Sequence, residues 1–355
     1  MVRLTRFLSA PIFIWWDITY ACNLHCKQCY SNSGRPAIDE LSTEEVRAIL
    51  RQLSEMEVFY VYYLGGEPFI RPDFIEIAAY TISLGLPIVV STNGWLIDDK
   101  KAHEIKQSGI QHVRVSIDGA IAETHDSIRG RRGSFERALS AIQSLKQAGI
   151  PKVGMVPTIM QDNFHEVEAM VDLAIENNVD EMQLVQLCGT GRGKTANSLT
   201  LSQLQRLRQI AARKQDEVRA CLHLYATEGI LKSRCQDCYL NRQSTPLMMG
   251  CTAGRTSVAL SPEGKVMPCL LDRQPAGDLR EQTLNQIWRD SPQLTDRRTI
   301  KDKCLECGYS EICARECPLE QNFPKEDRNL FADHCAEMPS HACTFRLCSS
   351  QKERR

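Results

Sequence analysis

The feature that most constrains this chain is a regular alternation, from residue 12 to about 220, of short β-rich runs with amphipathic helical stretches. The predicted strands occupy residues 12–19, 59–66, 87–94, 112–118, 152–160 and 181–188. Strands that alternate with helices form a parallel sheet with right-handed crossovers. Six β/α units suit an open barrel better than a closed eight-fold one, so we predict an α/β fold with a partial (β/α)6 TIM-like barrel.

The helix signals support this assignment. Ser42 can cap the first helix, and Glu45, three residues later, completes a capping box. The apolar residues that follow have the i, i+3, i+4, i+7 spacing of one buried helix face, at Val46, Ile49, Leu50 and Leu53. Later helices are predicted to begin near Pro72, Asp98, Ser134, His165 and Leu201.

The organisation of the chain changes beyond about residue 220, where short segments punctuated by Gly and Pro carry dense cysteines. A chain of 355 residues is long enough for one large and one smaller domain. We predict the partial barrel at 1–220, a linker or bridging segment at 221–250, a cysteine-rich iron-sulfur domain at 251–340 and a polar tail at 341–355.

Composition limits the partners. Lys and Arg total 43 against 44 Asp and Glu, which leaves no electrostatic reason to expect nucleic acid or an acidic membrane surface. The apolar stretch near the N-terminus ends at Asp17, and no segment approaches the roughly 18 apolar residues of a membrane helix. We therefore expect a cytoplasmic protein, in which 16 cysteines indicate metal or redox chemistry rather than structural disulfides.

The first cysteine group follows the first predicted strand. Cys22, Cys26 and Cys29 form C-x3-C-x2-C, a spacing that lets three thiolates converge on one inorganic centre. A structural zinc site needs four protein ligands, and His25 could supply the fourth. A four-iron cluster held by three thiolates would instead leave one iron able to bind a small molecule.

Two motifs in this half resemble those of radical S-adenosylmethionine enzymes. One is C-x3-C-x2-C followed by an aromatic residue, here Tyr30, and the other is Gly65-Gly66-Glu67-Pro68, which matches the family motif GGEP. The resemblance implies a 4Fe-4S cluster whose open iron chelates S-adenosylmethionine and releases a 5'-deoxyadenosyl radical. It also implies that the flexible glycines let backbone approach the cofactor, and that polar groups of the motif meet its ammonium. On its own, GGEP would be an ordinary strand-to-helix turn.

The same resemblance implies further cofactor contacts at later strand ends. Ser116 in SIDG and Arg129 in HDSIRG are similar to the residues that contact the cofactor's ribose and carboxylate. An arginine suits a carboxylate because its planar fork can bond both oxygens. Thr92 and Asn93 in STNG are weaker candidates, since this is also a good turn sequence. The alternative for Ser116 and Arg129 is an ordinary strand end and a surface arginine.

The second cysteine region resembles the SPASM extension of these enzymes. Its spacing is C-x12-G-x4-C, then C-x2-C-x5-C-x3-C, then one last cysteine, and the alternative is a zinc ribbon. The resemblance implies two auxiliary 4Fe-4S clusters, the first held by Cys251, Cys269 and Cys317 and the second by Cys304, Cys307, Cys313 and Cys335. The first needs an open iron or a fourth ligand, for which Cys238 is favoured slightly over Cys235. Cys188, Cys221, Cys343 and Cys348 stay unassigned.

The resemblance extends over nearly the whole chain and is strongest to peptide maturases, such as those of mycofactocin and pyrroloquinoline quinone. It implies hydrogen abstraction from a ribosomally made precursor peptide, followed by oxidative cross-linking or decarboxylation. Because the cluster motif starts at residue 22, we expect a separate leader-peptide-binding protein, together with an electron donor such as flavodoxin or ferredoxin. No general base can be chosen among Asp17, Glu67 and Asp118.

Two alternatives remain open for the function. One is a small-molecule radical enzyme of the haem pathway that acts on tetrapyrrole propionates, whose family shares GGEP, SIDG and the Gly-Arg-Gly at 191–193. The other is a non-catalytic electron carrier or zinc-binding scaffold. Iron and sulfide analysis distinguishes the scaffold from the two enzymes.

Overall fold

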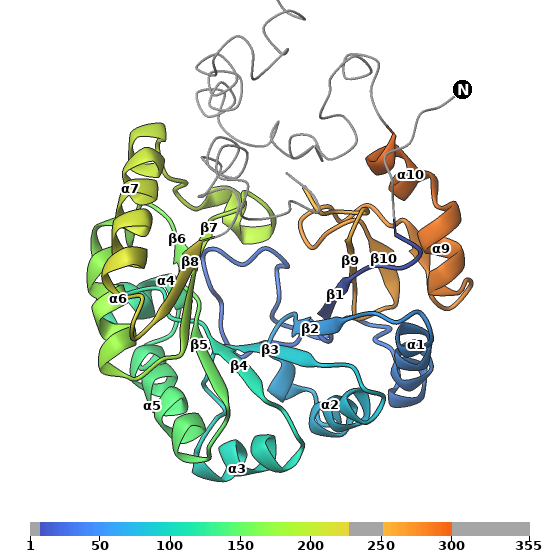
Figure 1. The fold of residues 1–355 in the computed structure, drawn as a ribbon, viewed down its shortest axis with the longest axis horizontal. Coiled ribbons are helices and arrows are strands. Elements are labelled where there is room, and N and C mark those ends of the chain that lie inside the picture. The colour runs from blue at the N-terminus through green and yellow to red at the C-terminus, as the bar shows by residue number, and fades with distance from the viewer. Residues whose placement is uncertain (1–7, 227–250, 300–355) are drawn as a thin grey trace, which may run out of the picture.

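The computed structural model describes residues 8–226 and 251–299, and these residues form a curved, open sheet with helices on its outer side (Figure 1). All six predicted strands are confirmed, and they pair in parallel in chain order. They are β1 (Phe13–Asp17), β2 (Tyr60–Leu64), β3 (Ile88–Thr92), β4 (His112–Val115), β5 (Lys152–Met155) and β7 (Glu181–Gln186). The predicted partial barrel is therefore the architecture of this half.

The predicted helices are also present, as α1 (Thr43–Glu55), α2 (Phe74–Ser83), α3 (Asp99–Gln107), α5 (Ser134–Gln147), α6 (Val167–Glu176) and α7 (Leu201–Glu217). Ser42 and Glu45 form the predicted capping box at α1. Asp98 caps α3 by accepting a hydrogen bond from the Lys101 amide at 2.7 Å. The helix expected near His165 begins as a short 3-10 turn, η2 (Phe164–Glu166), which leads directly into α6.

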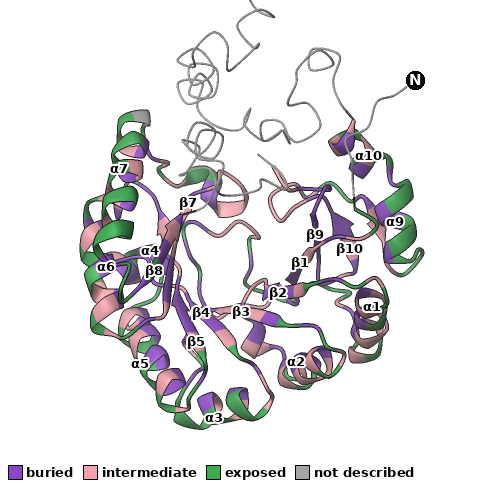
Figure 2. Ribbon diagram, in the orientation of Figure 1, coloured by how far each residue is buried: buried purple, intermediate pink, exposed green. Residues whose placement is uncertain are grey.

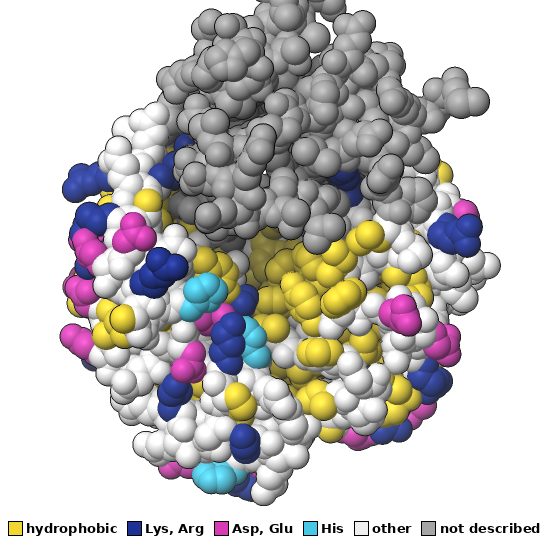
Figure 3. Space-filling model, in the orientation of Figure 1, with side chains coloured by type: hydrophobic (Ala, Val, Ile, Leu, Met, Phe, Trp, Pro, Cys, Tyr) yellow, Lys and Arg dark blue, Asp and Glu magenta, His cyan; other side chains and the backbone are white. Residues whose placement is uncertain are grey.

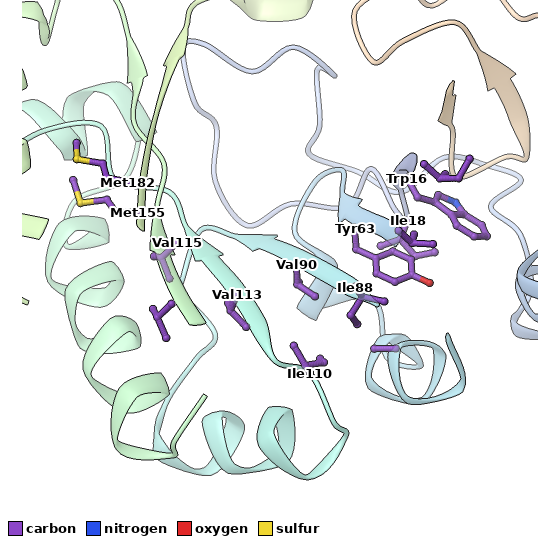
Figure 4. Packing of buried hydrophobic residues seen from close by; sticks show 14 of the residues in the cluster. Trp16, Ile18, Tyr63, Ile88, Val90, Ile110, Val113, Val115, Met155 and Met182 are labelled. Carbon is purple, nitrogen blue, oxygen red and sulfur yellow. The ribbon is translucent and has the colours of Figure 1, made fainter. Parts of the chain in front are cut away.

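The main core lies between the sheet and these helices. Figure 2 shows the buried residues concentrated on the strands and on the inward sides of the helices, with exposed residues on the outer surface. In Figure 4, Trp16, Tyr63, Val90, Val113 and Met155 lie in succession along this layer, and all are at most 1% exposed. Alternation along each strand sends the intervening side chains to the opposite, inner face.

The inner face of β1 and β2 is aromatic. The rings of Phe13 and Tyr60 stack with centroids 5.2 Å apart, and those of Trp15 and Tyr62 lie 4.7 Å apart. In Figure 3, hydrophobic side chains gather on the side of the molecule that carries these strands, whereas charged side chains are more frequent on the opposite side. One half of the open barrel therefore presents mainly apolar side chains, and the other half presents more charged ones.

The barrel half contains elements that the alternation did not predict. Helix α4 (Ala122–Arg129) lies between β4 and α5, so two helices follow this strand. The strand predicted at 152–160 is divided into β5 and a separate strand β6 (Thr158–Ile159), which pairs with β7. Strand β8 (His223–Ala226) lies beyond the boundary predicted at residue 220, yet it also pairs in parallel with β7. A helix of eight residues and a strand of four produce little periodicity, which explains why the sequence pattern did not indicate α4 and β8.

The described part of the C-terminal region extends the sheet at its other edge. Strand β9 (Ser257–Leu260) pairs in parallel with β1, and β10 (Lys265–Met267) and β11 (Gly277–Asp278) continue the sheet in antiparallel order. Two short helices follow, α9 (Leu284–Asp290) and α10 (Pro292–Arg298). This region is thus joined to the first strand of the barrel, a pairing that cysteine spacing could not indicate. None of the described helices has the length and apolarity needed to cross a membrane.

Candidate active site

The three predicted cluster cysteines lie in the loop that leaves the carboxyl end of β1. The Cys22 amide donates to the Gly34 carbonyl at 3.0 Å, which closes the loop. The thiols are near enough to raise one another's pKa: Cys26 and Cys29 both act on Cys22. The three side chains therefore lie in one loop and influence one another's charge.

Burial dominates the acidity of two of these thiols. It raises the pKa of Cys22 to about 12 and that of Cys26 above its ordinary value. Burial would also raise the pKa of Cys29, but hydrogen bonds from Ser31 and from the Ser33 backbone lower it overall. A bound cation would reverse the first two shifts, because metal ligation requires thiolates.

The arrangement does not fit a single zinc ion. Within residues 8–226 and 251–299, no three His, Cys, Asp or Glu side chains converge tightly enough to hold one metal ion. His25, the fourth ligand considered for zinc, is exposed, whereas its neighbour Cys26 is buried. Cysteines of a four-iron cluster each bind a different iron and need no common point, so the loop suits a cluster better.

The glycines of the GGEP motif pack against this loop. A Cβ on Gly65 would lie 2.3 Å from the Thr19 carbonyl oxygen, and one on Gly66 would lie 2.0 Å from that of Ala21. Gly65 also has a φ of 123°, which side chains rarely adopt. The close approach that requires glycine here is therefore between β2 and the cysteine loop, whereas the resemblance implied an approach to the cofactor.

Glu67 occupies a fully buried position beside the same loop. Its carboxylate accepts hydrogen bonds from the Thr92 hydroxyl at 2.8 Å and from the Asn93 amide at 2.7 Å. Burial raises its pKa to about 7, and these hydrogen bonds lower it in part. Pro68, the last residue of the motif, starts the 3-10 turn η1 (Pro68–Ile70). The structure thus brings Glu67, Thr92 and Asn93 together as one polar group.

Asn93 connects this group to the cysteine loop. Its side-chain amide donates to Asn23 Oδ1 at 2.8 Å and lies 4.0 Å from the Cys22 sulfur. Ser116 is half-buried at the end of the next strand, where its amide donates to the Thr92 carbonyl at 2.9 Å. All of these predicted cofactor residues therefore lie at the carboxyl edge of the sheet.

Arg129 approaches the cysteine loop from α4. It is 8% exposed, its Nη1 lies 3.8 Å from the Cys26 sulfur, and its Nε forms a 2.6 Å ion pair with Asp118. Asp118 is itself fully buried and also accepts from the Gln28 side-chain amide at 2.5 Å. Burial raises the pKa of Asp118, and Arg129 opposes that shift. The surface-arginine alternative for Arg129 is wrong.

Two residues that the sequence did not assign to the site support the loop. In the 3-10 segment η3 (Gly191–Thr195), Arg192 donates to the carbonyls of Cys26 and Ser33, each at 2.9 Å. A Cβ on Gly191 would lie 2.4 Å from the Cys29 carbonyl oxygen. The role of the Gly-Arg-Gly sequence at 191–193 is therefore to hold the cysteine loop in place.

Two buried polar atoms in this loop are left without a hydrogen-bond partner in the described part of the chain. They are the side-chain nitrogen of Asn23 and the side-chain oxygen of Gln28. Buried polar groups are nearly always paired, so unpaired ones beside three thiols indicate a place for a polar ligand. A polar cofactor bound here would supply the missing partners, so the residues present fit one.

A second polar network occupies the inner face of the sheet. Arg114 donates to Glu181 at 2.5 Å, to the hydroxyls of Tyr62 and Tyr225, and to Gln183. Burial opposes the charge of Arg114, yet its partners raise its pKa, while the pKa of Glu181 is lowered. Each of the three guanidinium nitrogens already has a protein acceptor, so this arginine is best explained as structural.

Of the predicted auxiliary ligands, Cys251 and Cys269 lie among the described residues, and both are half-buried. The Asp272 amide donates to the Cys269 sulfur at 3.3 Å. The remaining predicted ligands fall outside the described residues, namely Cys238, Cys304, Cys307, Cys313, Cys317 and Cys335, as does the alternative Cys235.

The sequence matches the Radical SAM superfamily over residues 16–174 and SPASM, an iron-sulfur cluster-binding domain, over residues 251–318. The AdoMet-dependent heme synthase of Methanosarcina barkeri is 32% identical over 321 residues, which cover 86% of this chain and 91% of that protein. This chain belongs to the radical SAM superfamily. As a radical SAM enzyme with a SPASM domain, it uses S-adenosylmethionine, a 4Fe-4S cluster and auxiliary iron-sulfur binding.

Two further proteins are similar to this radical SAM enzyme. The mycofactocin maturase MftC of Mycolicibacterium smegmatis is 31% identical over 330 residues, which cover 90% of this chain and 81% of that protein. The crystal structure of Streptococcus suis SuiB bound to S-adenosylmethionine covers 91% of this chain and 76% of that one, with a TM-score of 0.73 and 21% identity. The structural likeness supports the fold, and the named relatives include both heme synthases and mycofactocin maturases.

Proposed function

We propose that Cys22, Cys26 and Cys29 hold the catalytic 4Fe-4S cluster and that S-adenosylmethionine binds at its open iron. The observation that carries this proposal is three neighbouring thiols beside the unpaired polar atoms of Asn23 and Gln28. When bound, the cluster and S-adenosylmethionine supply a 5'-deoxyadenosyl radical, which is the chemistry of this superfamily. The residues of the chain would bind, orient and shield these groups.

The surrounding side chains suit this task. Arg129 places a buried positive charge beside Cys26, where it would stabilise the thiolate and the negative charge of a cluster. Asn93 is positioned by Glu67, so its amide would face the same centre from the other side. The proposed cofactor-binding residues also include Gly65, Gly66, Pro68, Thr92 and Ser116, of which the two glycines would act by shaping the loop.

The auxiliary clusters follow the same proposal. Cys251, Cys269 and Cys317 would bind the first, with Cys238 as its fourth ligand, and Cys304, Cys307, Cys313 and Cys335 would bind the second. The support is the match of residues 251–318 to the SPASM domain. Such clusters could accept the electron released when a substrate radical is oxidised.

For the substrate we propose a ribosomally made precursor peptide, oxidised by cross-linking or decarboxylation in the cytoplasm. The similarity to mycofactocin maturase MftC supports this, and so does the fold shared with SuiB, which has been solved bound to its precursor peptide SuiA. A separate leader-binding protein and a flavodoxin- or ferredoxin-like electron donor complete the proposal.

A second candidate is an enzyme that acts on a tetrapyrrole. Relatives named AdoMet-dependent heme synthase and Fe-coproporphyrin III synthase, both from Methanosarcina barkeri, favour it. The Gly-Arg-Gly at 191–193 does not, because its role in holding the cysteine loop is independent of the substrate. An aromatic inner wall, with Trp15 and Tyr62 in contact, would accept either a flat macrocycle or peptide side chains.

Anaerobic reconstitution followed by mass spectrometry tests both candidates. The wild-type enzyme would be reduced in the presence of S-adenosylmethionine and either precursor peptides encoded near its gene or iron coproporphyrin. We expect 5'-deoxyadenosine together with a mass loss in the peptide, and neither in a Cys26→Ala variant. A mass loss in the tetrapyrrole alone would establish the second candidate. Zinc without labile sulfide in the purified protein would exclude both.

A further inference from the structure

Arg273 belongs to the C-terminal region but contacts the start of the cysteine loop. It lies between β10 and β11, and its Nη1 donates to the Tyr20 hydroxyl at 2.6 Å. Its Nη2 forms a 3.2 Å ion pair with Asp17, the last residue of β1. The guanidinium also lies over two rings, with its carbon 5.2 Å from the centroid of Tyr20 and 5.8 Å from that of Tyr30.

The partner of this arginine is a carboxylate with no exposed surface. Asp17 is 0% exposed, and its second oxygen accepts a 2.6 Å hydrogen bond from the Tyr30 hydroxyl. Burial raises the pKa of Asp17 to about 6, and Arg273 is the foremost influence that opposes this shift. A buried carboxylate needs such a compensating charge, because an unpaired one is costly.

Arg273 is also next in the sequence to a residue that contacts a predicted auxiliary ligand. The preceding residue, Asp272, donates its amide to the Cys269 sulfur at 3.3 Å and forms an ion pair with Arg297 on α10. Tyr30 directly follows Cys29 in the sequence. A continuous set of contacts therefore runs from Cys269, through Arg273 and Asp17, to Tyr30 and the catalytic loop.

We propose that Arg273 is a positioning residue through which the auxiliary region fixes the catalytic cysteine loop and sets the charge beside the catalytic cluster. It acts through Asp17 and Tyr30 and does not touch the reacting groups. The inference rests on the proposed ligation of that cluster by Cys22, Cys26 and Cys29. Because the charge of the half-buried Arg273 compensates that of the fully buried Asp17, removing one partner should differ from removing both.

The electrostatic part can be measured as a redox potential. The variants are Asp17→Asn, Arg273→Leu and the double variant, each reconstituted and followed by electron paramagnetic resonance in a redox titration. The catalytic cluster is identified by the signal that changes when S-adenosylmethionine is added. We expect Asp17→Asn to make its potential more positive, since the charge of Arg273 is then uncompensated, and the double variant to return toward wild type. Equal potentials in Asp17→Asn and the double variant would overturn the proposal.

The positioning part is tested on the apoprotein, by denaturant unfolding of the same variants. We expect the double variant to be more stable than the sum of the single effects predicts, and additive effects would overturn the contact. A matched control is Arg280→Leu, which removes exposed ion pairs to Asp39 and Glu45 and should leave the potential unchanged. A wild-type protein without any signal that responds to S-adenosylmethionine would count against the cluster assignment itself, which the apoprotein experiment does not require.

Discussion

Replacing Gly66 by alanine should displace the loop that carries the catalytic cysteines. The added Cβ would lie 2.0 Å from the Ala21 carbonyl oxygen and 2.6 Å from its carbonyl carbon, so backbone and not a flexible side chain must move. The same stretch is tied by two backbone hydrogen bonds, from Gly66 to Thr19 at 2.7 Å and from Glu67 to Ala21 at 2.8 Å. Both are lost if the two segments separate.

The loss in the free energy of unfolding caused by Gly66→Ala can be estimated from these contacts. Overpacking a rigid site typically costs about 1–3 kcal/mol. Each broken hydrogen bond adds about 1 kcal/mol. We therefore expect Gly66→Ala to reduce the free energy of unfolding by about 3–5 kcal/mol, a large share of the usual 5–15 kcal/mol of a folded domain. Because Ala21 directly precedes Cys22, iron uptake should fall as well.

Denaturant unfolding of the apoprotein and iron content after reconstitution measure these two effects. Gly34→Ala is the matched control, since it lies in the same loop and its Cβ would meet no heavy atom within 4 Å. We expect this control to change stability by less than about 1 kcal/mol and to leave iron content intact. If the two variants proved equally stable, the close approach at Gly66 would not be what requires glycine there.

Three further predictions test other contacts. Glu67 has a pKa raised from 4.5 to about 7 by burial, so its carboxyl stabilises the fold at low pH and this contribution is lost as pH rises through 7. Glu67→Gln should remove about 3 kcal/mol of this pH dependence, as measured by unfolding of wild type and variant between pH 5 and 8. Arg192→Gln should lower stability by about 2 kcal/mol and reduce iron retention, because two carbonyls of the loop lose their donor, and unchanged iron content would contradict this. Ser42→Ala should cost about 1 kcal/mol in thermal unfolding without affecting iron, since it removes only a helix cap.

Local sequence signals predicted the barrel because each unit follows short-range rules. The capping box at Ser42 and the apolar spacing of α1 depend on neighbours within two helical turns, and the structure reproduces both. The pairing of β9 with β1 depends instead on residues more than 240 positions apart, Phe13 and Ser257 among them. No spacing or periodicity within either segment contains that information.

The candidate site was predictable in its residue types and less so in their roles. The motifs correctly indicated that the cysteines, Glu67 and Arg129 lie near one another at the carboxyl edge of the sheet. The roles of Gln28 and Arg273 could not be predicted, because each depends on a three-dimensional neighbour, Asp118 and Asp17 respectively. Both of these carboxylates are fully buried, and the burial of a polar side chain cannot be read from the sequence.

The hydrogen bonds of the cysteine loop indicate that its backbone loses conformational entropy during folding, before a cluster binds. Its carbonyl oxygens accept from the turn after β2, from η3 and from Arg131, which follows α4 and donates to Asn23 at 2.9 Å. These bonds use protein donors only, so they can form before any iron is bound. Fixing a residue's backbone costs about 1–2 kcal/mol, and here that cost is met during folding. The loop is then already ordered when its three thiols lose their protons, so substitutions that loosen it should weaken iron binding as well as the fold.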